Sequence, residues 1–188
     1  HQAECRVLLR TFRHMLHAEL PVEMLASAAS HPFQLGFARQ ALRMLPASEH
    51  VSFEATSLGL LICASSEAAL VEPMGLLRET YGTDLVLSPP RVRHVSLGNQ
   101  QYEPIMELSV TSSVRHRNAL REDLVRRQAA LLGDEEHPDR YVLHAEAPLR
   151  RLLGYGAALA SMTDGTAEHR IWLSRYVPLD GPPGGDAA

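Results

Sequence analysis

The residues with the clearest capacity for binding chemistry are arginines in the second half of the chain. They form two groups, whose members are Arg115, Arg117, Arg121, Arg126, Arg127, Arg150 and Arg151. A guanidinium group can donate two parallel hydrogen bonds to a phosphate, so an arginine-rich helix can bind a nucleic-acid backbone. The same side chains can instead solvate their helix by pairing with its carboxylates, here Glu122 and Asp123. Residue type and spacing leave both interpretations open.

Two further groupings contain residue types used in catalysis or metal binding. His144 and Glu146 would share one face of a strand and are suited to acid and base roles, but the sequence offers them no nucleophile or cleft. His14, His17 and Glu19 have the spacing of metal ligands, yet imidazoles three residues apart on an amphipathic helix more often face solvent. We therefore predict no catalytic residue and no metal site.

The basic composition excludes several enzyme classes. All 18 residues counted as Lys or Arg are arginine. A phosphate-binding loop needs Gly-Lys-Ser/Thr, and a Schiff base needs a lysine, so neither can form here. The dinucleotide-binding and α/β-hydrolase signatures are also absent from the sequence. We predict that this chain holds no cofactor and is not itself an enzyme.

Length, charge and cysteine content limit the number of domains and the kinds of partner that we expect. The chain has 188 residues, 45% of them hydrophobic, which is enough for two small domains with real cores. A formal charge of −4 argues against a strongly basic surface overall, so any contact with RNA must be made by a local basic patch. Cys5 and Cys63 make no disulfide framework, and no apolar run or signal segment suggests a membrane or export. The prediction is a cytoplasmic protein without membrane or DNA partners.

The first half of the sequence predicts a β-α-β-β-α-β unit. Apolar residues alternate in the expected strands and recur at helical spacing in the expected helices, with Phe33, Phe37, Ala41 and Met44 on one helix face. The expected elements are a strand at 19–27, a helix at 32–44, a hairpin at 51–55 and 58–64, a helix at 66–81, and a strand at 84–95 interrupted by two prolines. This order is the split ferredoxin-like unit.

The same order is predicted again after a polar joint at 96–101. Its elements are a strand at 104–110, a helix at 114–132, a strand at 141–146, a helix at 148–159 and a strand at 169–177. An additional edge strand near 131–136 is an alternative to the last part of the helix expected at 114–132.

Tyr155 and Trp172 can stack on a base, but in a small core such rings more often pack, and we predict packing for Trp172.

The predicted fold class is α+β, with two tandem ferredoxin-like domains. Each is expected to contain a four-stranded antiparallel sheet with two helices on one face. The predicted boundaries are an N-terminal extension at 1–18, domains at 19–96 and 102–178, and a disordered tail at 179–188 that is rich in Gly and Pro.

Several short motifs, in order, resemble translational GTPases of the elongation factor G, BipA/TypA and tetracycline ribosomal-protection group. Residues 76–87 and 90–92 are similar to the end of domain III, and Glu103-Pro104-Ile105-Met106-Glu107 is similar to the start of domain V. Residues 121–128, 148–149 and 153–155 resemble the two helices of domain V, and the stretch containing Met162-Thr163-Asp164-Gly165 and Arg175-Tyr176-Val177-Pro178 resembles its end.

This resemblance implies a ribosome-binding module whose arginines contact rRNA and whose first domain relays the state of a GTPase domain, in cis or in trans. GTP and Mg would bind that other domain, which the chain does not contain. Domain IV is expected to be absent, because only a short joint separates the two units. Residues 63–68 lack the Gly and His that the family usually carries there, which bears on signalling by domain III.

Two other functions fit the same predicted fold. The paired domains can form a regulatory module that binds a small ligand between its sheets. An acylphosphatase-type enzyme has the same topology, but it needs a phosphate-binding arginine loop that residues 28–31 lack. We predict the ribosome-binding module and keep the regulatory module as the alternative.

Overall fold

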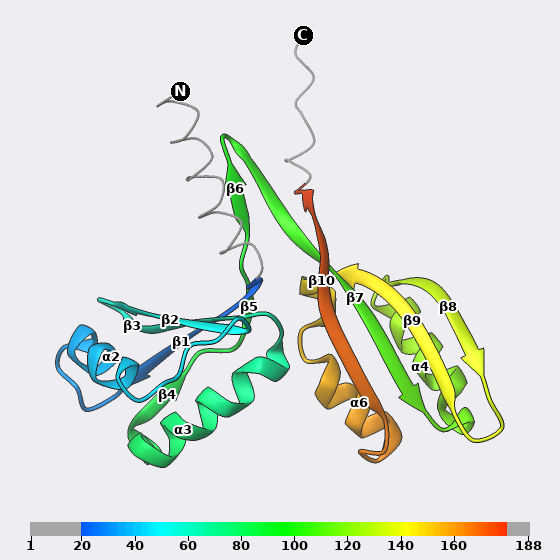
Figure 1. The fold of residues 1–188 in the computed structure, drawn as a ribbon, viewed down its shortest axis with the longest axis horizontal. Helices are drawn as coiled ribbons and strands as arrows, with labels where there is room; N and C mark the ends of the chain where they lie inside the picture. The colour runs from blue at the N-terminus through cyan, green and yellow to red at the C-terminus, as the bar shows by residue number, and fades with distance from the viewer. Residues whose placement is uncertain (1–19, 180–188) are drawn as a thin grey trace, which may run out of the picture. The chain divides into compact units, whose positions relative to one another are not determined.

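The computed structural model describes residues 20–179, and the chain divides into two compact units between Arg93 and His94 (Figure 1). The predicted extension at 1–18, the tail beyond Leu179 and the grouping of His14, His17 and Glu19 lie outside the described residues. Within 20–179, no helix combines the length and apolar character needed to cross a membrane.

The first unit is built on an antiparallel sheet with strand order β2-β3-β1-β4, and the short β5 also pairs with β1. Its strands are β1 (Val22–Ala28), β2 (Val51–Thr56), β3 (Gly59–Ala64), β4 (Leu85–Leu87) and β5 (Arg91–Val92). Its helices are α2 (Gln34–Leu42) and α3 (Val71–Tyr81), with short 3-10 helices at Glu67–Leu70 and Gly82–Asp84.

Alternation along β1 explains how this unit forms its core. Val22 and Met24 are buried while the residues between them are half-buried, because successive side chains point to opposite faces of a sheet. Phe37 from α2 and Leu77 from α3 are fully buried as well. The prediction that Phe33 joins this core is wrong: its backbone is extended, the helix begins after it, and its side chain is 78% exposed.

The second unit repeats this topology with strand order β10-β7-β9-β8, and the short β6 also pairs with β7. Its strands are β6 (Val95–Leu97), β7 (Gln100–Ser112), β8 (Ala130–Glu136), β9 (Tyr141–Pro148) and β10 (Glu168–Pro178). Its helices are α4 (Arg117–Arg126), α5 (Leu149–Leu152) and α6 (Tyr155–Thr163), with a 3-10 helix at Val114–His116. The ferredoxin-like fold class is confirmed for both units, with one short strand added to each sheet.

Two helix predictions in this unit are wrong in extent. The helix expected at 114–132 ends at Arg126, because the backbone turns through a positive φ of 60° at Gln128 and the chain then pairs as β8 with β9. The alternative of an edge strand there is confirmed. The helix expected at 148–159 is two helices, separated at Gly154, where φ is +77°. Such a φ suits glycine and interrupts a right-handed helix.

The residues expected to form a polar joint have structure of their own. Leu97 pairs with Gln100, and Val95 pairs with Tyr102, so β6 and the start of β7 make a hairpin around Gly98. The strand expected to run to 95 is therefore divided: β5 pairs with the first sheet, whereas β6 pairs with the second.

Gly59 provides a direct test of the first unit's packing. Its φ is +141°, and a Cβ atom there would lie 2.2 Å from the Ala26 carbonyl oxygen on the neighbouring strand. We expect Gly59→Ala to lower the free energy of unfolding by at least about 2 kcal/mol in urea denaturation. Gly36→Ala is the matched control, since its added methyl meets nothing within 4 Å in α2, and it should stabilise by up to about 1 kcal/mol. Equal urea midpoints for the two variants would contradict the packing described.

Candidate nucleic-acid interface

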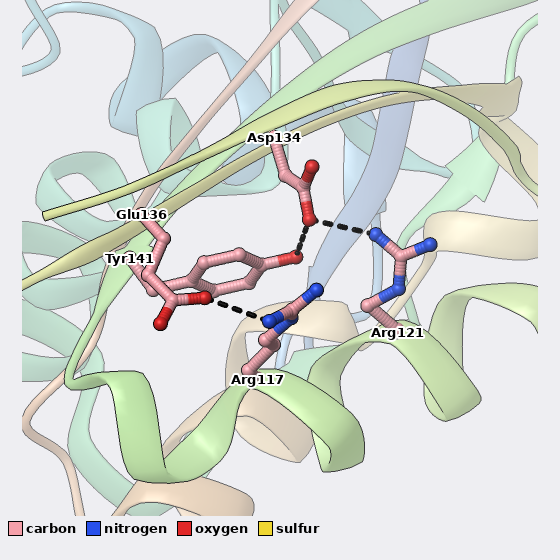
Figure 2. A network of polar contacts seen from close by, with 5 residues as sticks. All are labelled: Arg117, Arg121, Asp134, Glu136 and Tyr141. Atoms are coloured by element: carbon pink, nitrogen blue, oxygen red, sulfur yellow. Dashed lines mark hydrogen bonds and ion pairs between the residues drawn. The ribbon is translucent and has the colours of Figure 1, made fainter.

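Two arginines of α4 are tied to the neighbouring strand β8 by ion pairs (Figure 2). Arg117 Nη1 lies 2.7 Å from Glu136 Oε2, and Arg121 Nη1 lies 2.8 Å from Asp134 Oδ2. The two arginines are four residues apart, so they occupy one face of the helix, toward the strand. These two arginines therefore form ion pairs within the domain rather than being left unpaired for an external ligand.

A tyrosine joins this network from β9. The Tyr141 hydroxyl donates to Asp134 Oδ2 over 2.7 Å, and its ring is fully buried with the Arg117 guanidinium 5.9 Å from the ring centroid. The phenol hydrogen bond, followed by the charges of Arg121 and Arg117, holds the pKa of Asp134 below its ordinary value. Burial raises the pKa of Tyr141, so the phenol stays a donor.

Arg127 connects the end of α4 to the two helices that follow β9. Its Nε donates to Asp123 Oδ2 over 2.9 Å, and its Nη1 donates to the Arg151 carbonyl oxygen over 3.0 Å. Its guanidinium also lies 5.2 Å from the ring centroid of Tyr155, which is fully buried. Burial is the main cause that raises the pKa of Tyr155. Arg127 is therefore a packing residue, and Tyr155 belongs to the core.

Arg150 is paired in the same way. Its Nε lies 3.0 Å from Glu103 Oε2, and the Glu103 side chain is only 10% exposed. We call Arg117, Arg121, Arg127 and Arg150 the paired arginines, because each has a carboxylate within 3.0 Å.

The other three predicted arginines are exposed and lack such a partner; we call Arg115, Arg126 and Arg151 the outer arginines. Arg126 is 75% exposed and reaches Asp123 only at 3.6 Å. Arg115 contacts the neighbouring His116 ring at 3.2 Å, and Arg151 forms no ion pair among residues 20–179. Arg115 lies just before α4 and Arg126 is its last residue, so the two are eleven positions apart, about 16 Å at helical rise. These three guanidinium groups can accept an external anion.

The grouping of His144 and Glu146 on β9 also contains a paired carboxylate. His144 and Glu146 share one face of the sheet, but Glu146 accepts two hydrogen bonds of 2.7 Å from Arg175. These bonds lower the pKa of Glu146, which makes its carboxylate a weaker base than an unpaired one.

The prediction that Trp172 packs in the core is wrong. Its side chain is 39% exposed, on the sheet face opposite to Ile171 and Leu173, because neighbouring residues of a strand point to opposite faces. The Arg170 guanidinium lies 6.0 Å from the Trp172 ring centroid. The prediction did not include Arg170 among binding residues, although its spacing of two residues from Trp172 already places both on one face.

Across 20–179, no three His, Cys, Asp or Glu side chains come together as metal ligands. The sequence also lacks the lysine of a phosphate-binding loop. That this chain holds no cofactor stays a prediction.

Comparison with known proteins agrees with the arrangement of the second unit. Residues 100–185, which start with β7, match the family model for the elongation factor G C-terminus. The chain is 28% identical over 181 residues to the mitochondrial ribosome-releasing factor 2 of Danio rerio, covering 89% of this chain and 23% of that protein. It is 34% identical over 79 residues to the mitochondrial elongation factor G of Drosophila pseudoobscura pseudoobscura, covering 42% of this chain and 11% of that protein.

A solved structure shares the fold over most of the chain. The crystal structure of a Thermus thermophilus protein superposes with a TM-score of 0.60, covering 86% of this chain and 41% of that one, at 15% identity. The chain spans less than a quarter of the length of the two curated relatives above.

The sequence matches support a C-terminal module of a translation factor. Residues 100–185 are an elongation factor G C-terminal domain, and the chain is related to the C-terminal part of elongation factor G and its relatives. The resemblance drawn from the short motifs is thereby confirmed.

The division between paired and outer arginines predicts different effects at two adjacent positions. Arg127→Ala should lower the free energy of unfolding by about 2 kcal/mol, because it leaves the buried Asp123 carboxylate without its short hydrogen bond. Arg126→Ala removes the same charge from a side chain that is 75% exposed, and should change stability by less than about 0.5 kcal/mol. Urea denaturation of both variants checks this, and equal losses would show that the division is wrong.

The Asp134 network predicts a measurable pKa. Tyr141→Phe removes the hydrogen bond that contributes most to the lowered pKa of Asp134, so this pKa should rise in the variant. Because the folded-state pKa is depressed, the ionised carboxylate contributes stability that is present above its unfolded-state pKa and lost as pH falls through the folded-state value. Carboxyl carbon NMR titration measures the pKa directly. Tyr102→Phe, at a position that pairs with Val95 and Pro178, is the control and should leave it unchanged.

Proposed function

We propose that this chain is the ribosome-binding module of an elongation factor G-like translation factor and that it contacts rRNA through the outer arginines. The observation that carries this proposal is the division of charge around α4. The paired arginines fix α4 and α5 against β8 and the start of β7, whereas Arg115, Arg126 and Arg151 face outward.

Such an arrangement suits phosphate recognition for a physical reason. A guanidinium group that donates to a carboxylate has its charge partly neutralised and fewer donors left for a phosphate, whereas an unpaired group offers all of its five N–H donors. The supporting helices are held to neighbouring elements by three ion pairs of 3.0 Å or less and by the hydrogen bond from Arg127 to the Arg151 carbonyl oxygen, so the outer arginines start from a defined backbone position. The names of the matched relatives, a ribosome-releasing factor and an elongation factor, support the same target.

The remaining parts of the proposal follow from the resemblance. GTP and Mg bind a separate GTPase domain, in cis or in trans, and the first unit relays the state of that domain. The chain performs no chemistry itself. The matched relatives include mitochondrial proteins, so the predicted cytoplasmic location stays a prediction.

Co-sedimentation with purified 70S ribosomes across a salt series tests this function. Replacing all three outer arginines by Ala should weaken pelleting. It should also reduce the magnitude of the slope of log affinity against log salt by about 2 to 3, because binding with fewer phosphate contacts releases fewer counterions. The matched control replaces Arg39, Arg43 and Arg78, three exposed arginines of the first unit, and removes the same charge. The control should keep the slope of the unchanged chain.

Equal loss of binding in both triple variants would mean that charge alone attracts the chain, which contradicts a defined arginine site. No pelleting of the unchanged chain even at low salt would contradict direct ribosome binding by this module. A ligand-dependent melting shift in a metabolite screen would then favour the regulatory alternative.

A further inference from the structure

The second unit has one sheet face that its helices do not cover. Met106, Leu108 and Val110 of β7 are buried, as are Leu143 and Ala145 of β9, whereas the residues between them are half-buried. The buried set faces the helices, because α4 contacts β8 and α5 contacts β7 and β9. We call the opposite surface the open face; its members are Glu107, Ser109, His144, Glu146, Arg170, Trp172 and Arg175.

Trp172 is the exposed aromatic of the open face, and Arg170 lies beside it. The Arg170 guanidinium is 6.0 Å from the Trp172 ring centroid, and Arg170 forms no ion pair among the residues that the structure describes. An exposed indole with a cation against it presents two flat surfaces at the edge of the sheet. Unpaired nucleobases stack on both aromatic rings and guanidinium planes.

The charge around this pair favours an anionic ligand at Arg170. Arg175 is neutralised by two hydrogen bonds of 2.7 Å to Glu146. Glu107 lies directly opposite Trp172 in the β7–β10 register and close enough to Arg175 to contribute to its raised pKa. Within the described part of the chain, Arg170 is thus the cation of the open face without a carboxylate partner, and a phosphate next to a stacked base would complement it.

Glu107 adds a preference among bases. Residues opposite each other on antiparallel strands have Cβ atoms about 5 Å apart, so the Glu107 carboxylate lies beside the indole. An ionised carboxylate only accepts hydrogen bonds. It can accept from the exocyclic amine of cytosine, whereas uracil has a carbonyl oxygen at that position.

We infer that the open face of the second unit is a second RNA site, which binds an unpaired base of single-stranded RNA by stacking on Trp172 and Arg170. Glu107 selects bases that carry an exocyclic amine. This inference rests on the proposed function in its choice of RNA as the partner, but it uses none of the outer arginines. The two sites can therefore fail separately.

Binding of short RNA to the full chain tests the site directly. Trp172 is the single Trp of the sequence, so its fluorescence reports on this position alone. Addition of an oligocytidylate of about eight nucleotides should quench that fluorescence, and anisotropy of the same labelled RNA gives the affinity. Trp172→Ala should weaken binding about 5- to 100-fold, whereas Trp172→Phe, which keeps a ring, should lose much less.

Two further variants test the partners of the tryptophan. Arg170→Ala should weaken binding severalfold, whereas Arg39→Ala, an exposed arginine in the first unit, should not. Oligocytidylate should bind about 2- to 10-fold more tightly than oligouridylate. Glu107→Gln should abolish that preference, because an amide can donate to uracil as well as accept from cytosine.

Unchanged fluorescence with RNA, or equal affinity of Trp172→Ala and the unchanged chain, would overturn the inference. Neither result would affect ribosome pelleting through the outer arginines. Conversely, loss of pelleting in the outer-arginine triple variant with intact quenching by RNA would support two separate sites. If Trp172→Ala loses its native melting transition, the comparison of Trp172→Phe with Arg170→Ala decides, and full affinity in Arg170→Ala would overturn the inference.

Discussion

The pairing of β8 with β9 is the interaction on which the rest of the second unit depends. It brings Asp134 and Glu136 under α4, where they neutralise Arg121 and Arg117. Without this strand, Arg117 and Arg121 would lose their carboxylate partners and be exposed like Arg115, Arg126 and Arg151. With it, they join Arg127 and Arg150, whose partners are Asp123 and Glu103, so four of the seven arginines are paired and three face outward. Whether Arg117 and Arg121 are paired therefore depends on backbone hydrogen bonds beyond the helix itself.

A ferredoxin-like unit has two unequal faces, and we propose that the second unit uses them for different chemistry. Helices cover the apolar face, and the exposed Arg115, Arg126 and Arg151 lie on or beside these helices. The other face stays polar and contains the exposed indole of Trp172. Phosphate recognition from a helix and base stacking on a sheet are compatible in one small domain, because they need different surfaces and different side chains.

The sequence predicted the topology better than it predicted which side chains are exposed and free to bind a ligand. Apolar patterns in expected strands, such as 51–55 of the first unit and 104–110 and 141–146 of the second, together with helical spacing between strands, were enough to predict two ferredoxin-like units. The length of α4 was misjudged because Leu131 and Leu132 continue a helical pattern, whereas β8 forms through pairing with β9, a tertiary interaction. The ion pairs of Arg117 and Arg121 join residues 19 and 13 positions apart, and no local rule connects them. Trp172 is different: its alternation with Ile171 and Leu173 already placed it opposite the core, and the general tendency of Trp to pack was given too much weight.

We propose that the outer arginines, and not the paired ones, meet the ribosome. Arginine-specific modification with phenylglyoxal, quantified by mass spectrometry with and without 70S ribosomes, tests this residue by residue. In the free chain Arg115, Arg126 and Arg151 should react quickly and Arg117, Arg121, Arg127 and Arg150 slowly, because the latter group is held by carboxylates. Ribosomes should protect the three outer arginines and leave the rates of the other four nearly unchanged. Protection that is absent, or that falls equally on all seven residues, would contradict the account.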